Sequence, residues 1–289
     1  MKSIGFIGLG IMGKPMARNL MKAGFELHIY ARHPKEVEDV VAEGMALHPT
    51  IAECVRGRDA VITIVGFPSD VHEVYFDSGN ILDSADEGTY LIDMTTSSPT
   101  LAEEIHAAAA KKGQKSLDAP VSGGDTGAKA GTLSIFCGGD EEDFEACRPL
   151  FEAMGKTITY QGKAGCGQHA KLANQIIIAG TISGVCEGLT YAQAQGLDIG
   201  NLLGPLMGGG AGSNQLTNYG PRILKGDFAP GFMIKHFVKD MRLANDGAAE
   251  KELDLDILAQ VLANYVKLLD AGLGDEGTQA LMKFYGRDF

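Results

Sequence analysis

The first residues of the chain carry the feature that most constrains its fold. Residues 2–7 form a short apolar segment typical of a buried strand, and glycines follow at Gly8, Gly10 and Gly13. Apolar residues then recur at helical spacing up to about residue 23. A strand, a glycine-rich turn and a helix in this order predict the first unit of a parallel α/β sheet.

The same turn has the spacing of a dinucleotide-binding loop. In such a loop Gly8 would make the tight turn, Gly10 would let the backbone approach a pyrophosphate, and Gly13 would let helix and strand pack closely. The pyrophosphate would rest on the positive end of the following helix. An ordinary strand-to-helix turn with structural glycines is the alternative. The predicted cofactor-binding loop consists of Gly8, Leu9, Gly10, Ile11, Met12 and Gly13.

The end of the second predicted strand, residues 26–30, bears on the choice of cofactor. A carboxylate at this point would bind the ribose 2′-hydroxyl of NAD. The sequence has Ala31, Arg32 and His33 there instead. The planar donor fork of Arg32 suits a 2′-phosphate, so we predict NADP(H) in preference to NAD(H). Alternatively, Arg32 only stacks on the adenine or stays solvated.

The rest of the chain predicts two domains, as its 289 residues allow. Further strands alternate with helices as far as Gly162, which predicts a doubly wound, parallel Rossmann sheet. From about residue 164 to 193 the pattern is one continuous helix, and only helices follow. We expect a dinucleotide-binding domain over 1–162, a long interdomain helix over 163–193, and an all-helical substrate and oligomerisation domain over 194–289. The further strands are predicted at 60–65, 90–94, 115–118 and 133–137, with helices including 34–43 and 100–112.

Composition excludes several classes of function. The formal net charge is −12, which disfavours a nucleic-acid-binding protein. The five cysteines include no CxxC pair, and no histidine spacing suits a metal, so we expect free thiols and no metal site. We find no signal sequence and no apolar run of about 18 residues, the length needed to span a bilayer. We therefore expect a cytoplasmic protein that does not enter a membrane.

Four segments in order resemble the 3-hydroxyacid dehydrogenase family. That family includes 3-hydroxyisobutyrate dehydrogenase, tartronate semialdehyde reductase, and the succinic semialdehyde and glyoxylate reductases. The resemblance covers nearly the whole chain, and four ordered motifs are more specific than one glycine loop. The segments are 5–20, then Asp118-Ala119-Pro120-Val121-Ser122-Gly123-Gly124, then Gly165-x-Gly167 leading to Lys171-Leu172-Ala173-Asn174, and Lys239-Asp240.

Lys171 is the candidate catalytic residue. A lysine near the start of an apolar helix is costly unless it faces a polar cleft, and burial of an amine favours its use in proton transfer. The resemblance implies that Lys171 is the acid/base that protonates the carbonyl oxygen during reduction. A structural lysine is the alternative. Asn174 and Gln175 lie one turn further on, where the family places a substrate-binding asparagine. Many members have asparagine at both positions, so it stays open which of the two binds substrate.

Other site residues follow from the same resemblance. A Ser-Gly-Gly loop exposes backbone N–H groups that can hold a carboxylate, and the resemblance assigns the substrate carboxylate to Ser122, Gly123 and Gly124. The Gly-Phe that follows Val65 departs from the Pro-containing loop of many relatives. The remaining cofactor contacts implied by the resemblance are Val65, Thr96 beside the nicotinamide ribose, and Phe232 and Lys239 at the nicotinamide end.

Together these features predict an NAD(P)-dependent hydroxyacid dehydrogenase. It would reversibly reduce a small semialdehyde acid of the tartronate, methylmalonate or succinate semialdehyde type. By family resemblance we expect a homodimer or homotetramer. An imine reductase-like enzyme is an alternative, although those relatives usually replace the lysine. A 6-phosphogluconate dehydrogenase is disfavoured because no basic cluster suits a sugar phosphate. A catalytically silent dinucleotide-binding module of the same fold is the remaining alternative.

Overall fold

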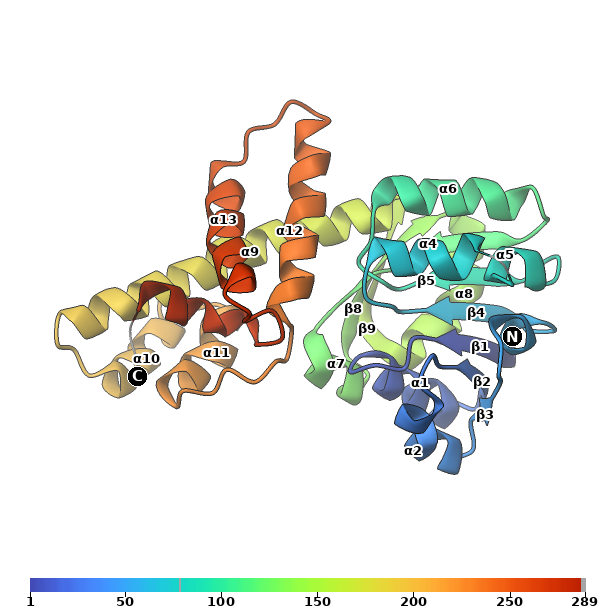
Figure 1. Ribbon diagram of the computed structural model, residues 1–289, viewed down its shortest axis with the longest axis horizontal. Coiled ribbons are helices and arrows are strands. Elements are labelled where there is room, and N and C mark those ends of the chain that lie inside the picture. Colours follow the sequence, from blue (N-terminus) through green and yellow to red (C-terminus); the bar gives the residue numbers. More distant parts are fainter. Residues whose placement is uncertain (78, 287–289) are drawn as a thin grey trace. The chain divides into compact units, whose positions relative to one another are not determined.

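The computed structural model describes residues 1–77 and 79–286. The chain divides into two compact units, Met1–Lys171 and Leu172–Phe289. The division falls inside the longest helix, α9 (Cys166–Ala194), which starts two residues later than the sequence predicts. Figure 1 labels most of the elements, and each unit has a hydrophobic core of its own.

The first unit is built on one sheet. Among the described residues nine strands join it, in the order β3-β2-β1-β4-β5-β6-β8-β7, with β9 beside β8. The strands from β3 to β6 pair in parallel, which confirms the predicted doubly wound Rossmann fold. The strands are β1 (Ser3–Ile7), β2 (Glu26–Tyr30), β3 (Ala46–Leu47), β4 (Ala60–Thr63), β5 (Tyr90–Asp93), β6 (Lys115–Asp118), β7 (Val121–Ser122), β8 (Leu133–Gly139) and β9 (Gly155–Gly162).

The far edge of the sheet differs from the prediction. The sequence predicts only parallel strands, but β8 runs antiparallel to both β6 and β7. The chain reaches β8 through a short helix, α7 (Gly124–Ala130), and such a short connection suits antiparallel neighbours. The strands β3, β7 and β9 were not predicted from the sequence. As a result Ser122 lies in a strand, paired with Ser134, where a loop was expected.

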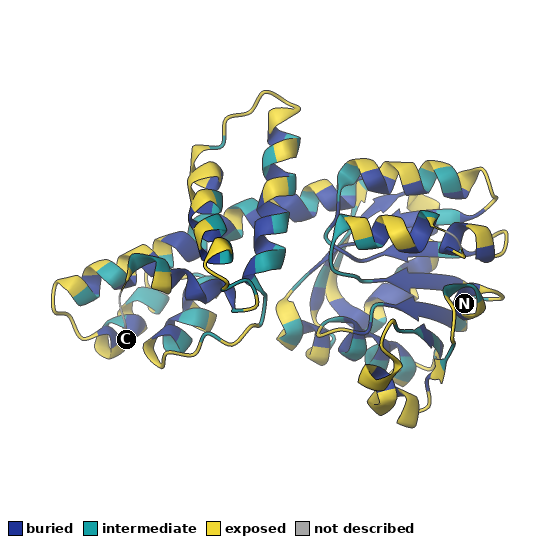
Figure 2. Ribbon diagram, in the orientation of Figure 1, coloured by how far each residue is buried: buried dark blue, intermediate teal, exposed yellow. Residues whose placement is uncertain are grey.

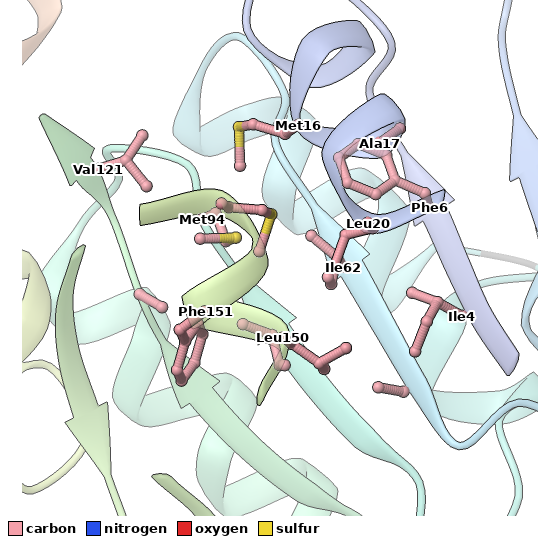
Figure 3. Packing of buried hydrophobic residues seen from close by; sticks show 14 of the residues in the cluster. Ile4, Phe6, Met16, Ala17, Leu20, Ile62, Met94, Val121, Leu150 and Phe151 are labelled. Atoms are coloured by element: carbon pink, nitrogen blue, oxygen red, sulfur yellow. The ribbon is translucent and has the colours of Figure 1, made fainter. Parts of the chain in front are cut away.

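Helices cover both faces of this sheet because strand side chains alternate between the faces. Ile4 and Phe6 of β1 belong to one core cluster, whereas Ile7 belongs to the cluster on the opposite face. Figure 3 shows the first cluster, where Met16 and Leu20 pack with strand residues. The first face is covered by α1 (Gly13–Lys22), η1 (Pro34–Val37), α2 (Glu38–Ala42), α7 and α8 (Glu141–Met154); the second by α3 (Ile51–Val55), α4 (Pro68–Phe76), α5 (Ile81–Ser84) and α6 (Pro99–Ala110).

The second unit consists of helices, with one isolated bridge between Met233 and Gly277 in its described part. Its core gathers Ile182 of α9, Phe237 of α12 and Tyr265 of α13, all fully buried. Figure 2 shows the buried stripe that each helix turns toward this core. Besides α9, the helices are α10 (Ile199–Gly208), α11 (Asn214–Leu224), α12 (Ile234–Ala249), α13 (Asp256–Asp270) and η2 (Thr278–Tyr285).

Helix α9 corrects one expectation. By length and composition alone it could cross a membrane, so the expectation that no segment reaches that length is wrong. The central helix of a folded domain passes the same test. Here Ala179, Cys186 and Leu189 lie in the core of the second unit, and Lys171 and Glu187 would be costly in a bilayer. We therefore treat α9 as a core helix.

Candidate active site

The candidate site of the first unit lies at the carboxyl edge of the sheet. The strand order turns back between β1 and β4, since β2 lies on one side of β1 and β4 on the other. Ligands of doubly wound sheets bind outside the carboxyl ends of the strands at such a switch point. The turn after β1, residues 8–13, therefore occupies the expected place of a dinucleotide.

The three glycines of this turn have different surroundings. Gly8 has φ +101°, and a Cβ there would lie 2.0 Å from the carbonyl oxygen of Ile64. A Cβ on Gly13 would lie 1.8 Å from the carbonyl oxygen of Gly8. A Cβ on Gly10, by contrast, would meet no described atom within 4 Å. Gly8 and Gly13 are thus required by close packing of the turn itself, whereas Gly10 borders open space.

The start of α1 offers a place for an anion. Its N-cap residue Met12 makes no side-chain cap, and its first turn contains no acidic residue. The first backbone N–H groups of a helix have no partner within the helix, and the helix dipole makes this end positive. Ile11, beside them, is 50% exposed. The open space at Gly10 and this uncapped helix end together fit a pyrophosphate.

Arg32 lies two residues after the end of β2, and it has two acidic neighbours. Its guanidinium Nη2 is 2.7 Å from Glu73 Oε2 and 3.2 Å from Asp70 Oδ1. Both carboxylates belong to α4, and Asp70 also accepts a hydrogen bond from the backbone N–H of Phe67 at 2.9 Å. These partners lie 38 and 41 residues away in the chain, so no local pattern indicates them. A 2′-phosphate would compete with them for Arg32.

A partly buried hydrogen bond joins the loops after β4 and β5, and two buried bonds of Asp93 support it. The backbone N–H of Val65 donates to Thr95 Oγ1 at 2.9 Å, and that of Thr95 donates to Asp93 Oδ1 at 3.2 Å. Thr63 Oγ1 also donates to Asp93 Oδ1, at 2.8 Å. The predicted residues Val65 and Thr96 therefore lie on loops that Thr95 holds together.

The predicted carboxylate-binding segment spans the end of β7 and the start of α7. Gly123 and Gly124 have φ +133° and +63°, conformations that favour glycine. Helix α7 begins at Gly124, and the carbonyl of Gly123 accepts a hydrogen bond from Gly127 N–H at 3.1 Å. The N–H groups at this turn have no partner in a preceding helical turn. They form the kind of backbone site that can hold a carboxylate.

Lys171 lies in the second turn of α9 and is only 6% exposed. The start of this helix is tied to the end of β6. Asp118 Oδ1 accepts the backbone N–H of Gly165 at 2.9 Å, and Oδ2 accepts that of Gln168 at 2.8 Å. Burial raises the pKa of the Asp118 carboxyl to about 6, and these two N–H bonds only partly oppose the shift.

Four polar residues of the second unit lie together: the predicted site residues Asn174, Gln175 and Lys239, and Asp240 beside Lys239. Gln175 Nε2 donates to Asp240 Oδ2 at 2.6 Å, and Asn174 Nδ2 donates to Gln175 Oε1 at 2.8 Å. Lys239 Nζ lies 2.9 Å from Asp240 Oδ1. Phe232 packs edge-on against Phe237 at a centroid distance of 5.6 Å. The buried Asp240 is the member of this network whose role the sequence did not indicate.

Comparison with known proteins agrees with this geometry. A family model described as the NAD binding domain of 6-phosphogluconate dehydrogenase matches residues 3–162. A second, described as NAD-binding of NADP-dependent 3-hydroxyisobutyrate dehydrogenase, matches residues 165–285. The chain belongs to the 3-hydroxyacid dehydrogenase family. The predicted family and fold are confirmed, and the protein is an oxidoreductase with a nicotinamide dinucleotide as its cofactor.

Individual relatives show how far this similarity extends. An uncharacterized oxidoreductase of Bacillus subtilis is 47% identical over 98% of this chain and 99% of its own. The 2-hydroxy-3-oxopropionate reductase of Escherichia coli is 40% identical over 87% of this chain and 86% of its own. A structure of Mycobacterium tuberculosis 3-hydroxyisobutyrate dehydrogenase with L-serine has a TM-score of 0.89, with 32% identity over 99% of this chain and all of that one.

Proposed function

We propose that this 3-hydroxyacid dehydrogenase reversibly reduces a small semialdehyde acid to the hydroxy acid, with NADP(H) as cofactor and Lys171 as acid/base. The observation that carries the proposal is the placement of Lys171. It is buried on a helix whose start is hydrogen-bonded to the carboxyl end of β6, at the sheet edge where the dinucleotide loop also lies. A buried ammonium is costly unless it serves a polar site.

The residues around the glycine turn fit the cofactor. Gly10, Ile11, Met12 and Gly13 would hold its pyrophosphate through the open space at Gly10 and the uncapped start of α1. Arg32 would exchange its contacts with Asp70 and Glu73 for the 2′-phosphate, since the residues that follow β2 in the sequence include no carboxylate. When bound, the nicotinamide supplies or accepts the hydride.

The substrate is held and protonated by other residues. Ser122, Gly123 and Gly124 bind its carboxylate through backbone and hydroxyl donors. Lys171 Nζ donates a proton to the aldehyde oxygen as hydride reaches the carbon, and takes the proton back during oxidation. The proton transfer leaves a neutral amine, which solvent reprotonates.

Asn174 is the better candidate for orienting the reacting oxygen. Gln175 is 1% exposed, donates to Asp240 and accepts from Asn174, so its amide is committed to the network in the second unit. Asn174 is half-buried and lies three residues after Lys171, on the same side of the helix. Phe232, Lys239, Val65 and Thr96 stay proposed cofactor contacts that rest on the family resemblance.

We also propose that the enzyme is a homodimer or homotetramer. Ile177 and Tyr191 of α9 and Ile257 of α13 are about two-thirds exposed or more, at 70%, 68% and 67%. The family resemblance carries this proposal, and these three side chains are the ones that we expect to be covered at a subunit contact. Light scattering on the purified protein tests this directly, and a monomer at micromolar concentration would contradict it.

A substrate panel tests the proposed reaction. The purified enzyme is mixed with NADPH or NADH and with tartronate semialdehyde, methylmalonate semialdehyde, succinate semialdehyde or glyoxylate, and nicotinamide absorbance is followed. We expect turnover of at least one three- or four-carbon acid, with NADPH preferred. The matching aldehydes without the carboxylate should react far more slowly. Equal rates with and without the carboxylate would contradict the assignment of Ser122–Gly124.

A further inference from the structure

The side chain of Gln168 joins α9 to the loop after β5. It is fully buried, at 0% exposed. Its Nε2 donates to the carbonyl oxygen of Thr95 at 2.8 Å, and its Oε1 accepts the backbone N–H of Ser97 at 2.8 Å. Both ends of the amide are therefore used, on either side of Thr96. The amide fixes the backbone of that loop at two points.

The backbone of the same helical turn is fixed from β6. Asp118 uses both carboxylate oxygens, one for Gly165 N–H and one for Gln168 N–H. The contact is so close that a Cβ on Gly167 would lie 2.4 Å from the carbonyl oxygen of Asp118 and 2.5 Å from that of Phe136. The start of α9 thus has almost no freedom to rotate or slide along the sheet edge.

This network joins the cofactor loops to the helical turn that precedes the candidate catalytic lysine. Thr95, whose carbonyl accepts from Gln168, also accepts the Val65 N–H through its hydroxyl. Lys171 lies three residues after Gln168, so the two side chains share one side of the helix. Both are buried. A shift of the helix start would therefore move Lys171 relative to the loop that carries Thr96.

We propose that Gln168 and Asp118 are positioning residues that set where Lys171 presents its amine for proton transfer. Gln168 locks the helix to the loop after β5, and Asp118 locks the same turn to β6. Neither residue exchanges a proton with the substrate. The inference rests on the proposed role of Lys171 as acid/base.

Substitution Gln168→Met tests the inference because methionine keeps the length and removes both hydrogen bonds. Misplacing a catalytic group by about 1 Å can lower a rate by about a hundredfold. We expect kcat to fall between about tenfold and a hundredfold. The Kd of NADPH should rise by a smaller factor than kcat falls, since the loop of Thr96 loses support but the glycine turn is untouched. In the Lys171→Ala background the same substitution should cost little more, because its effect acts through the missing amine.

Gln114→Met is the matched control. Gln114 is also buried, and its Nε2 donates to two backbone carbonyls, those of Leu82 at 3.0 Å and Ala85 at 2.7 Å. It precedes β6, at the edge of the sheet opposite the site. We expect Gln114→Met to lose about as much thermal stability as Gln168→Met but to keep kcat near the wild-type value. That result would show that lost stability alone does not lower kcat.

The outcomes distinguish the inference from the proposed function. If Lys171→Ala keeps wild-type turnover, the proposed function fails. If Lys171→Ala loses turnover but Gln168→Met lowers the single-turnover rate equally in both backgrounds, the positioning role is overturned. Should Gln168→Met fail to fold, Asp118→Asn serves in the same cycle. It retains the size of the side chain, and we expect a lower kcat, an unchanged Kd of NADPH and no further loss without Lys171.

Discussion

Alanine substitutions at Gly10 and Gly13 should have different effects: Gly13→Ala should lower stability, and Gly10→Ala should weaken cofactor binding. The methyl group added at Gly13 would lie 1.8 Å from the carbonyl oxygen of Gly8. The backbone would have to move apart by more than about 1 Å, and overpacking of this kind destabilises proteins by about 1–3 kcal/mol. For a domain of this size each kcal/mol corresponds to roughly 2–4 °C in Tm. We therefore expect Gly13→Ala to lower the Tm by several degrees.

Gly10→Ala should have the opposite profile. The added methyl group meets no described atom within 4 Å, and the backbone there does not require glycine. Stability should stay within about 0.5 kcal/mol of the wild type. The methyl group would, however, fill the space offered to the pyrophosphate. We expect the Kd of NADPH to rise at least about tenfold, which corresponds to about 1.4 kcal/mol of binding energy.

The assay pairs thermal melting without cofactor with a fluorescence titration of NADPH. Gly204→Ala, at an exposed position of α10 with open space around it, controls for the substitution itself. The reasoning is refuted if Gly10→Ala binds NADPH like the wild type, or if Gly13→Ala melts at the wild-type temperature.

Three further predictions concern charge and burial. The pKa of Asp118 is raised to about 6 in the folded protein, so ionisation of Asp118 between about pH 4 and 7 destabilises the fold. Over this range the unfolding free energy of the wild type, measured in urea, should fall by up to about 3 kcal/mol relative to that of Asp118→Asn. A difference that does not change with pH would contradict this. Arg32→Ala should weaken NADPH binding about tenfold more than NADH binding, and equal losses in titration would reject the 2′-phosphate contact. Gln175→Leu removes a hydrogen bond from the buried carboxylate of Asp240 and should destabilise the second unit by about 1–3 kcal/mol, measured by thermal melting; unchanged melting would count against the network.

The features that the sequence predicted are those imposed by local chemistry. The glycine turn was recognisable because close packing at Gly8 and Gly13 dictates the residue type at fixed spacing. The apolar strands were recognisable because burial on both faces leaves a run of apolar residues. Helix α9 was recognisable because its helical pattern continues with almost no turn signals. By contrast β3 and β7 have two residues each, too few to show alternation. β9 exposes half of its length and carries polar residues, so it did not read as a buried strand.

The interactions that organise the candidate site could not be predicted in the same way. Gln168 meets Thr95 and Ser97 across 73 and 71 residues of chain, and Asp118 meets Gly165 across 47. Such contacts depend on which strands become neighbours, and no spacing in the sequence encodes that. Asp118 and Gly167 were visible only as members of motifs. Their physical role emerged once β6, β8 and the start of α9 were placed together.

The central claim is that Lys171 carries the proton, and turnover of Lys171→Ala tests it most directly. The variant is assayed at saturating NADPH with the acid that the wild type reduces fastest, after titration has shown that NADPH still binds. General acid–base catalysis contributes about 10²–10⁴-fold, so we predict a loss of that size in kcat. Turnover within tenfold of the wild type, with the same pH dependence, would contradict the claim.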